Sequence, residues 1–134
     1  RKMNIEQLAS LLKENGVVGA GGAGFPSYAK LSDKADTVIL NCAECEPLFR
    51  LHRQLMSAYT EEILTMLDTV RDAVGAKRAI VAIKSVYTEA IEKIELVKPF
   101  GKKVLTKLIA QIYKRYTGGG KNHGKKMAFK LGRF

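Results

Sequence analysis

The chain has 134 residues, of which 46% are hydrophobic and 27% charged. This composition is that of one folded domain, and it excludes a disordered or low-complexity chain. Two cysteines are too few for a disulfide scaffold, no signal peptide opens the chain, and no apolar run approaches the roughly 18 residues that a membrane-spanning helix needs. We therefore expect a cytoplasmic protein.

The formal net charge of +10 is distributed very unevenly along the chain. Residues 1–97 carry 12 Lys and Arg against 13 Asp and Glu, whereas residues 98–134 carry 11 Lys and Arg and no acid. A basic segment of this kind binds nucleic acid or an acidic protein, or is simply solvated. No recognisable nucleic-acid motif accompanies it, so the charge does not favour nucleic acid as the partner.

The first expected element is an amphipathic helix over residues 4–15, because Ile5, Leu8, Leu11 and Leu12 recur at helical spacing. The stretch GVVGAGGAGFP follows, from Gly16 to Pro26. Proline favours the first position of a helix, which predicts a short helix that begins at Pro26 and continues through residues 27–31.

Glycines dominate the segment between these two helices. Gly19, Gly21 and Gly24 satisfy G-x-G-x-x-G, a spacing that elsewhere brings backbone N–H groups up to a pyrophosphate. That motif normally follows a buried strand, but here a helix precedes it, so an ordinary dinucleotide-binding fold is not predicted to begin here. A phosphate-binding loop and a flexible turn between two helices remain the alternatives.

The rest of the chain alternates between strands and helices. Residues 37–41 and 78–84 are apolar and rich in β-branched side chains, which predicts two buried strands. Helical spacing covers residues 53–74, ended by Gly75, and residues 87–96. Residues 103–113 fit a strand or a helix. The pattern predicts an α/β fold with a parallel sheet that is covered by helices on both faces.

The segment NCAECEP, residues 41–47, directly follows the first predicted strand. Ligands of open α/β sheets bind outside the carboxyl ends of the strands, so a site is expected here. Asn41 offers a donor and an acceptor, and Glu44 and Glu46 can accept hydrogen bonds from a ribose, a flavin or a nicotinamide. The alternative is that the two acids only stabilise the start of the next helix.

Cys42 and Cys45 form a C-x-x-C pair, which suggests a redox pair or half of a metal site. A tetrahedral centre needs two more ligands, and only His52 and His123 remain, without paired spacing. We therefore predict no metal site and favour structural thiols. His52 is expected at the surface or at the entry of a helix.

Taken together, GVVGAGGAGFP, ILNCAECEP and RQLM resemble the N-terminal domain of the RnfC-type electron-transport subunits. The likeness covers about residues 4–95 and is closest to the variants in the cobalamin reductase of propanediol utilisation and in the proline-reductase-associated electron carrier. All of these resemble the flavin- and NADH-binding 51 kDa subunit of complex I. The resemblance implies a three-layer, Rossmann-like parallel sheet with helices on both faces.

The resemblance also implies an FMN site and a binding place for NADH. The glycine loop, with Gly19, Gly21, Gly22 and Gly24, would lie along the flavin and its phosphate, with Lys30 nearby. Asn41, Glu44 and Cys45 would border the flavin ring, and Glu44 and Glu46 would lie near the bound NADH, which makes Glu44 the expected catalytic residue. NADH would transfer hydride to FMN, and the electrons would pass to iron–sulfur centres on other domains or subunits.

Two positions depart from the family pattern: His52 and Lys121 stand where acidic residues are expected. We expect residues 1–97 to form the FMN- and NADH-binding core, and residues 98–134 to form a basic segment that contributes a final strand and loop of that domain. The alternative function is a non-catalytic module that docks an acidic redox partner or nucleic acid through this segment. The expected location is the cytoplasm, including the periphery of a membrane complex or a bacterial microcompartment, without membrane insertion.

Overall fold

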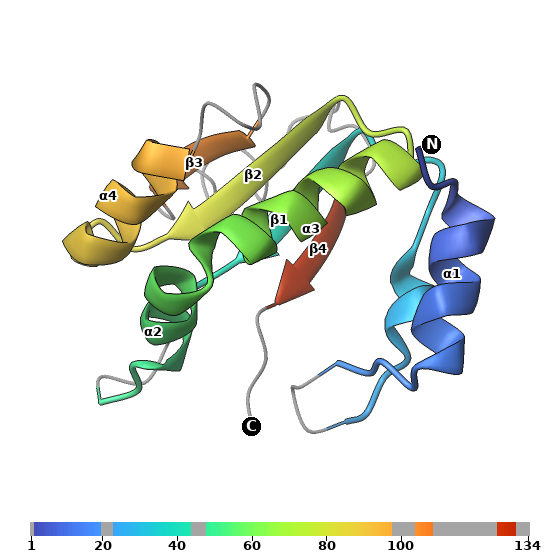
Figure 1. Ribbon diagram of the computed structural model, residues 1–134, viewed down its shortest axis with the longest axis horizontal. Coiled ribbons are helices and arrows are strands. Elements are labelled where there is room, and N and C mark those ends of the chain that lie inside the picture. The colour runs from blue at the N-terminus through green and yellow to red at the C-terminus, as the bar shows by residue number, and fades with distance from the viewer. Residues whose placement is uncertain (1, 20–22, 44–47, 98–103, 109–125, 131–134) are drawn as a thin grey trace, which may run out of the picture.

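A four-stranded parallel sheet organises the chain (Figure 1). The computed structural model describes residues 2–19, 23–43, 48–97, 104–108 and 126–130. The strands are β1 (Thr37–Asn41), β2 (Arg78–Ile83), β3 (Val104–Leu108) and β4 (Lys126–Lys130). The predicted α/β fold with a parallel sheet is confirmed, and residues 103–113, which fitted either element, contain a strand.

The strand order is β3-β2-β1-β4. The chain therefore moves from β1 to β2 to β3 in one direction and then crosses to the other side of β1 to form β4. The order in which strands are added to the sheet therefore reverses between β1 and β4, although all four strands are parallel. In this class of fold, ligands bind at such a point, outside the carboxyl ends of the strands. Asn41, the last residue of β1, lies at this point, opposite Ala82 of β2 and Lys130 of β4.

The described part of the chain also contains four α-helices and one short 3₁₀ helix, and buried residues of all four α-helices join one hydrophobic cluster on the same face of the sheet. The helices are α1 (Ile5–Glu14), the 3₁₀ helix η1 (Ser27–Lys30), α2 (Leu51–Ala58), α3 (Thr60–Ala73) and α4 (Thr88–Val97). Since crossover connections between parallel strands usually contain helices, α2 and α3 occupy the connection from β1 to β2, and α4 that from β2 to β3.

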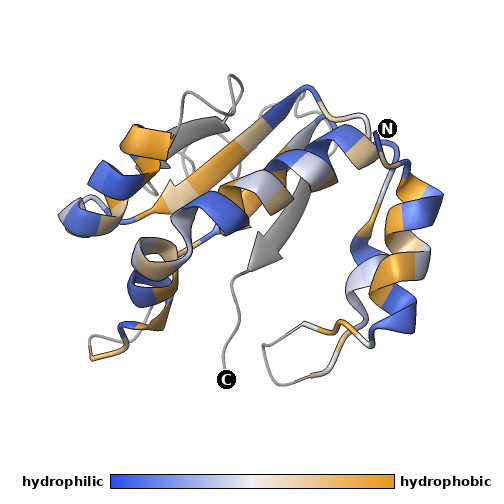
Figure 2. Cartoon of the chain, in the orientation of Figure 1, coloured by the Kyte–Doolittle hydropathy of each residue, from blue (hydrophilic) through white to orange (hydrophobic). Residues whose placement is uncertain are grey.

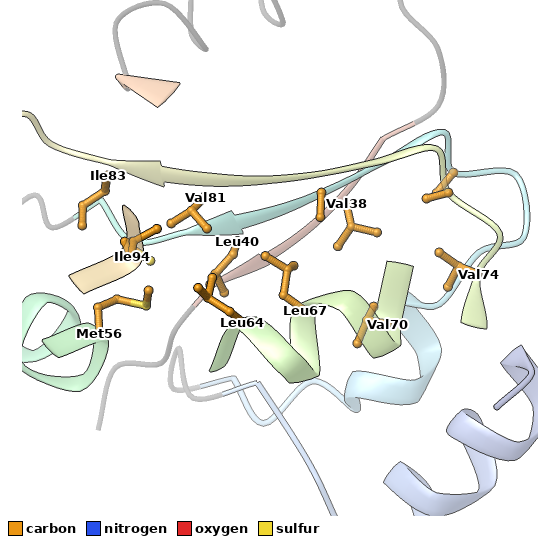
Figure 3. Close-up of a cluster of buried hydrophobic side chains, with 14 of the residues drawn as sticks. Val38, Leu40, Met56, Leu64, Leu67, Val70, Val74, Val81, Ile83 and Ile94 are labelled. Carbon is orange, nitrogen blue, oxygen red and sulfur yellow. The ribbon is translucent and has the colours of Figure 1, made fainter. Parts of the chain in front are cut away.

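The main hydrophobic core lies between the sheet and these helices (Figure 3). Val38 and Leu40 of β1 and Val81 of β2 pack there with buried side chains of all four α-helices. Successive strand residues point to opposite faces, so Ile39, Ile80 and Ala82 form a second buried cluster. Both faces of the sheet therefore carry buried side chains, as a three-layer arrangement requires. Figure 2 shows the corresponding run of hydrophobic residues along β2.

The helix predicted over residues 53–74 is in fact two helices, so that prediction was wrong in its continuity. The chain leaves helical geometry at Tyr59, where φ is −128° and ψ is 38°. Thr60 begins α3, and its hydroxyl donates to the carbonyl oxygen of Met56 in α2. Periodicity could not reveal the break, because apolar residues recur at helical spacing on both sides of it.

His52 lies in the first turn of α2, as expected for a helix entry, but it is buried and not at the surface. Its position four residues before Met56 places both side chains on the same face of α2. Met56 is fully buried in the main core. The imidazole is therefore buried because α2 packs this face inward.

Candidate functional site

The described parts of the glycine-rich segment, residues 16–19 and 23–27, pair with each other directly after α1, and we call this paired segment the glycine hairpin. Gly16 turns the chain with a φ of +62°, which favours glycine. Val18 and Pro26 then form an antiparallel bridge, with hydrogen bonds of 3.0 Å from Ser27 N to Val17 O and 2.7 Å from Gly19 N to Phe25 O. On the returning side of the hairpin, Gly24 has a φ of +59°.

Lys30 lies against the stem of this hairpin. A Cβ atom added at Gly19 would come within 3.2 Å of Lys30 Nζ and 3.4 Å of the Phe25 carbonyl oxygen. The same ammonium group lies 5.6 Å from the centre of the Phe25 ring. The structure thus brings three residues together, and a side chain at position 19 would require the lysine ammonium group to shift by a few tenths of an ångström. The result is a cation beside bare backbone, which suits a phosphate group.

Asn41 occupies the carboxyl end of β1, at the point where the strand order of the sheet reverses. Its side-chain Oδ1 accepts a hydrogen bond of 2.9 Å from the backbone N of Ala43, which fixes the turn that leaves the strand. The amide NH₂ group is the donor end of the same side chain. Cys42, the next residue, is buried, and its backbone N donates to Ala82 O at 2.8 Å.

Several predicted site residues lie outside the described part of the chain: Gly21, Gly22, Glu44, Cys45 and Glu46, and Lys121 among the departures. Their roles stay predictions. The described residues thus provide two groups, the hairpin with Gly19, Gly24 and Lys30, and Asn41 at the end of β1.

A cavity of about 580 Å³ lies between α2 and α4 and was not predicted from the sequence. Eleven residues from the segments 50–58 and 86–93 line it: Arg50, Arg53, Gln54, Ser57, Ala58, Val86, Tyr87, Thr88, Glu89, Ala90 and Lys93. Within the described residues, no group of three or more His, Cys, Asp or Glu side chains could hold a metal ion. No helix in that same part of the chain is both long and apolar enough to span a membrane.

Comparison with known proteins assigns the family. The model of the Nuo51 FMN-binding domain matches residues 12–124. The chain therefore belongs to the Nuo51 FMN-binding domain family, whose cofactor is the FMN that the resemblance implied.

Two kinds of curated relative support this assignment. The chain is 42% identical over 86 residues to the cobalamin reductase PduS of Citrobacter freundii, covering 64% of this chain and 19% of the relative. It is 34% identical over 103 residues to a component of the Na(+)-translocating ferredoxin:NAD(+) oxidoreductase complex of Acetobacterium woodii, covering 74% of this chain and 23% of that relative. The chain thus spans about a fifth of the length of these relatives.

The fold is also that of a solved structure. A chain of the NAD+-reducing [NiFe]-hydrogenase in the H2-reduced state superposes with a TM-score of 0.75 and 20% identity. The match covers 95% of this chain and 29% of the hydrogenase chain. At this identity the likeness establishes the fold alone, and it agrees with the Rossmann-like architecture expected from the sequence.

The described residues fit FMN on chemical grounds. The flavin carries a phosphate, for which Lys30, held beside Gly19, supplies a cation. The ring system of the flavin has donor and acceptor edges, and Asn41 presents an amide at the sheet position where ligands of this fold class bind.

Proposed function

We propose that this chain is the flavin- and NADH-binding domain of an electron-transfer oxidoreductase. The observation that carries the proposal is the Lys30 ammonium group held against Gly19 in the glycine hairpin of a chain that belongs to an FMN-binding family. Bound FMN supplies the redox chemistry, since it accepts a hydride from NADH and releases electrons singly to iron–sulfur centres.

The contribution of this chain is binding and orientation. Lys30 and the hairpin backbone, together with Gly21 and Gly22, hold the phosphate, and Asn41 hydrogen-bonds the flavin ring. Glu44 and Glu46 accept hydrogen bonds from NADH, with Glu44 nearest the reacting atoms, and Cys45 borders the ring. The partners are NADH and domains or subunits that carry iron–sulfur clusters.

The proposed cellular location follows from these partners. We propose the cytoplasm, at the periphery of a membrane complex or within a bacterial microcompartment. The alternative, docking of an acidic partner through the basic residues after position 97, depends on a segment that lies mostly outside the described residues, and no described contact favours it.

Titration with FMN tests the proposal directly. Protein at micromolar concentration is expected to quench flavin fluorescence in a saturable way, and NADH is then expected to bleach the visible absorbance of the bound flavin. Absence of FMN binding in excess flavin would refute the proposal for this chain. Binding without bleaching would retain the flavin site and remove the NADH site.

Substitution at Lys30 tests the phosphate contact. Lys30→Gln removes the cation beside Gly19, so FMN affinity is expected to fall about 10-fold, in the range of a lost charge-assisted hydrogen bond. Lys34→Gln is the matched control, because Lys34 is exposed and the charge change is identical. Equal losses in both variants would show a non-specific effect of charge.

Substitution at Gly21 tests the glycine loop. Gly21→Val places a branched side chain where the backbone is proposed to contact the flavin, and FMN binding should be abolished while the far-UV circular dichroism is unchanged. Ala29→Val adds the same side chain to the exposed side of η1 and is expected to leave FMN binding intact. Retained affinity in Gly21→Val would remove the loop from the site.

A further inference from the structure

The cavity between α2 and α4 is strongly basic. Arg50, Arg53 and Lys93 line it, and Glu89 is the one carboxylate among its described lining residues. Glu89 Oε1 already lies 3.2 Å from Lys93 Nζ, so this acid offsets the lysine. The two arginines leave a net positive charge in the cavity.

The guanidinium group of Arg53 lies over an aromatic ring that also lines this cavity. Its guanidinium carbon lies 5.2 Å from the centre of the Tyr87 ring, which is buried. A guanidinium over an aromatic ring gains a cation–π contact, and its planar N–H donors can form paired hydrogen bonds to an oxyanion.

The two walls of the cavity are joined to each other. Lys93 Nζ of α4 donates to the backbone carbonyl oxygen of Ser57 in α2 at 3.0 Å. Both helices are also anchored in the main core, where Met56 of α2 and Ile94 of α4 are fully buried (Figure 3). A cavity whose two walls are linked to each other and anchored in the core keeps its shape, which reduces the cost of ordering on binding.

We propose that this cavity binds a small organic phosphate. Its volume, about 580 Å³, falls within the usual range of small-molecule sites. Phosphate oxygens match the planar donors of Arg50 and Arg53, and a dianion balances both charges. Ala58 and Val86 supply apolar lining for the organic part of the ligand. None of the residues proposed to hold FMN or NADH lines this cavity, so the proposal goes beyond the function proposed above.

Phenyl phosphate is a suitable probe, because it joins a phosphate to a small apolar ring. Binding to the full chain is followed by ¹H–¹⁵N NMR at low salt, reading the Arg53 side chain and the amides of residues 88–90. We expect saturable shifts at these positions. Benzoate, which has the same ring with a carboxylate, is expected to bind at least 10-fold more weakly. Benzoate binding of equal strength, or no saturable shift with phenyl phosphate, would overturn the proposal.

Variants distinguish this cavity from the flavin site, which also takes a phosphate. Arg53→Gln is expected to weaken phenyl phosphate binding at least 10-fold and to leave FMN affinity unchanged. Arg50 is exposed, so its replacement does not disturb the core, and Arg50→Gln is expected to weaken phenyl phosphate binding several-fold. Lys77→Gln, with the same charge change at the amino end of β2, is expected to have no effect. Unchanged binding in both arginine variants, or an equal loss in Lys77→Gln, would contradict the assignment.

Discussion

At the scale of single residues, a buried arginine, Arg71, pairs with two carboxylates of α3, and one of these, Asp72, also pairs with the N-terminal end of the chain. Arg71 Nη1 lies 2.5 Å from Asp68 Oδ1, and Nη2 lies 2.6 Å from Asp72 Oδ1. The second carboxylate also pairs with Lys2 Nζ at 3.1 Å. The hydrogen bond from Arg71 is the main reason that the pKa of Asp72 lies below its ordinary value of 3.8.

A lowered carboxyl pKa makes stability depend on pH. The folded state binds the Asp72 proton more weakly than the unfolded chain does, so the carboxylate stabilises the fold above pH 3.8, and this contribution disappears as the pH falls through the folded pKa. Asp72→Asn is therefore expected to lower the free energy of unfolding at pH 7 by about 0.5–1 kcal/mol, as for partly exposed ion pairs. The difference should shrink towards pH 3.

Urea denaturation of the parent protein and of Asp72→Asn between pH 7 and about pH 3 measures this effect. Asp33→Asn serves as the control, because Asp33 is exposed in the loop before β1. A deficit in Asp72→Asn that stays constant across this range would contradict the assigned cause.

At the scale of elements, α1 is the support of the glycine hairpin. Its start is fixed by a capping box, in which Asn4 Oδ1 accepts from Gln7 N at 2.8 Å and Gln7 Oε1 accepts from Asn4 N at 3.1 Å. Leu8 and Leu12 bury the inner face of the helix. The helix ends where Gly16 turns the chain into the hairpin.

Loss of the N-cap should weaken this element measurably. Asn4→Ala removes the side-chain acceptor and is expected to lower the free energy of unfolding by about 1 kcal/mol. Asn4→Ser keeps an oxygen acceptor at the same position and is expected to stay near the parent value. Thermal and urea unfolding provide the comparison, and an Asn4→Ala variant as stable as Asn4→Ser would show that the cap contributes nothing.

At the scale of the whole molecule, the basic C-terminal region supplies two strands of the sheet. β3 pairs with β2, and β4 pairs with β1, so both neighbours of the central pair come from beyond residue 97. The domain boundary at residue 97 stays a prediction. Without the two outer strands, β1 and β2 would expose both edges, which favours aggregation.

Truncation after residue 97 tests the role of this region. The shortened chain is expected to aggregate or to lose cooperative unfolding, because a two-stranded sheet is marginal in water. Size-exclusion chromatography and thermal unfolding report the outcome. A monomeric truncated chain that unfolds at the parent temperature would show that residues 98–134 are an appendage to an independent core.

Local patterns in the sequence determined many elements and part of the candidate site. The strand predicted over residues 37–41 has those bounds in the structure, and the predicted first helix has its N-cap at Asn4. Gly75, predicted to end a helix, has a φ of +70° directly after α3. These features depend on near neighbours in the chain, so periodicity, capping residues and glycine suffice to predict them.

Only the tertiary structure decided which distant segments meet. The strand order β3-β2-β1-β4 makes the end of β1 the reversal point of the sheet, and this order depends on pairings between strands far apart in the sequence. The burial of His52 and the cavity that joins residues 50–58 to residues 86–93 likewise come from the packing of α2 against the core and α4. A hydrophobic pattern predicts which face of an element is buried but not its partner, because many partners satisfy the same burial.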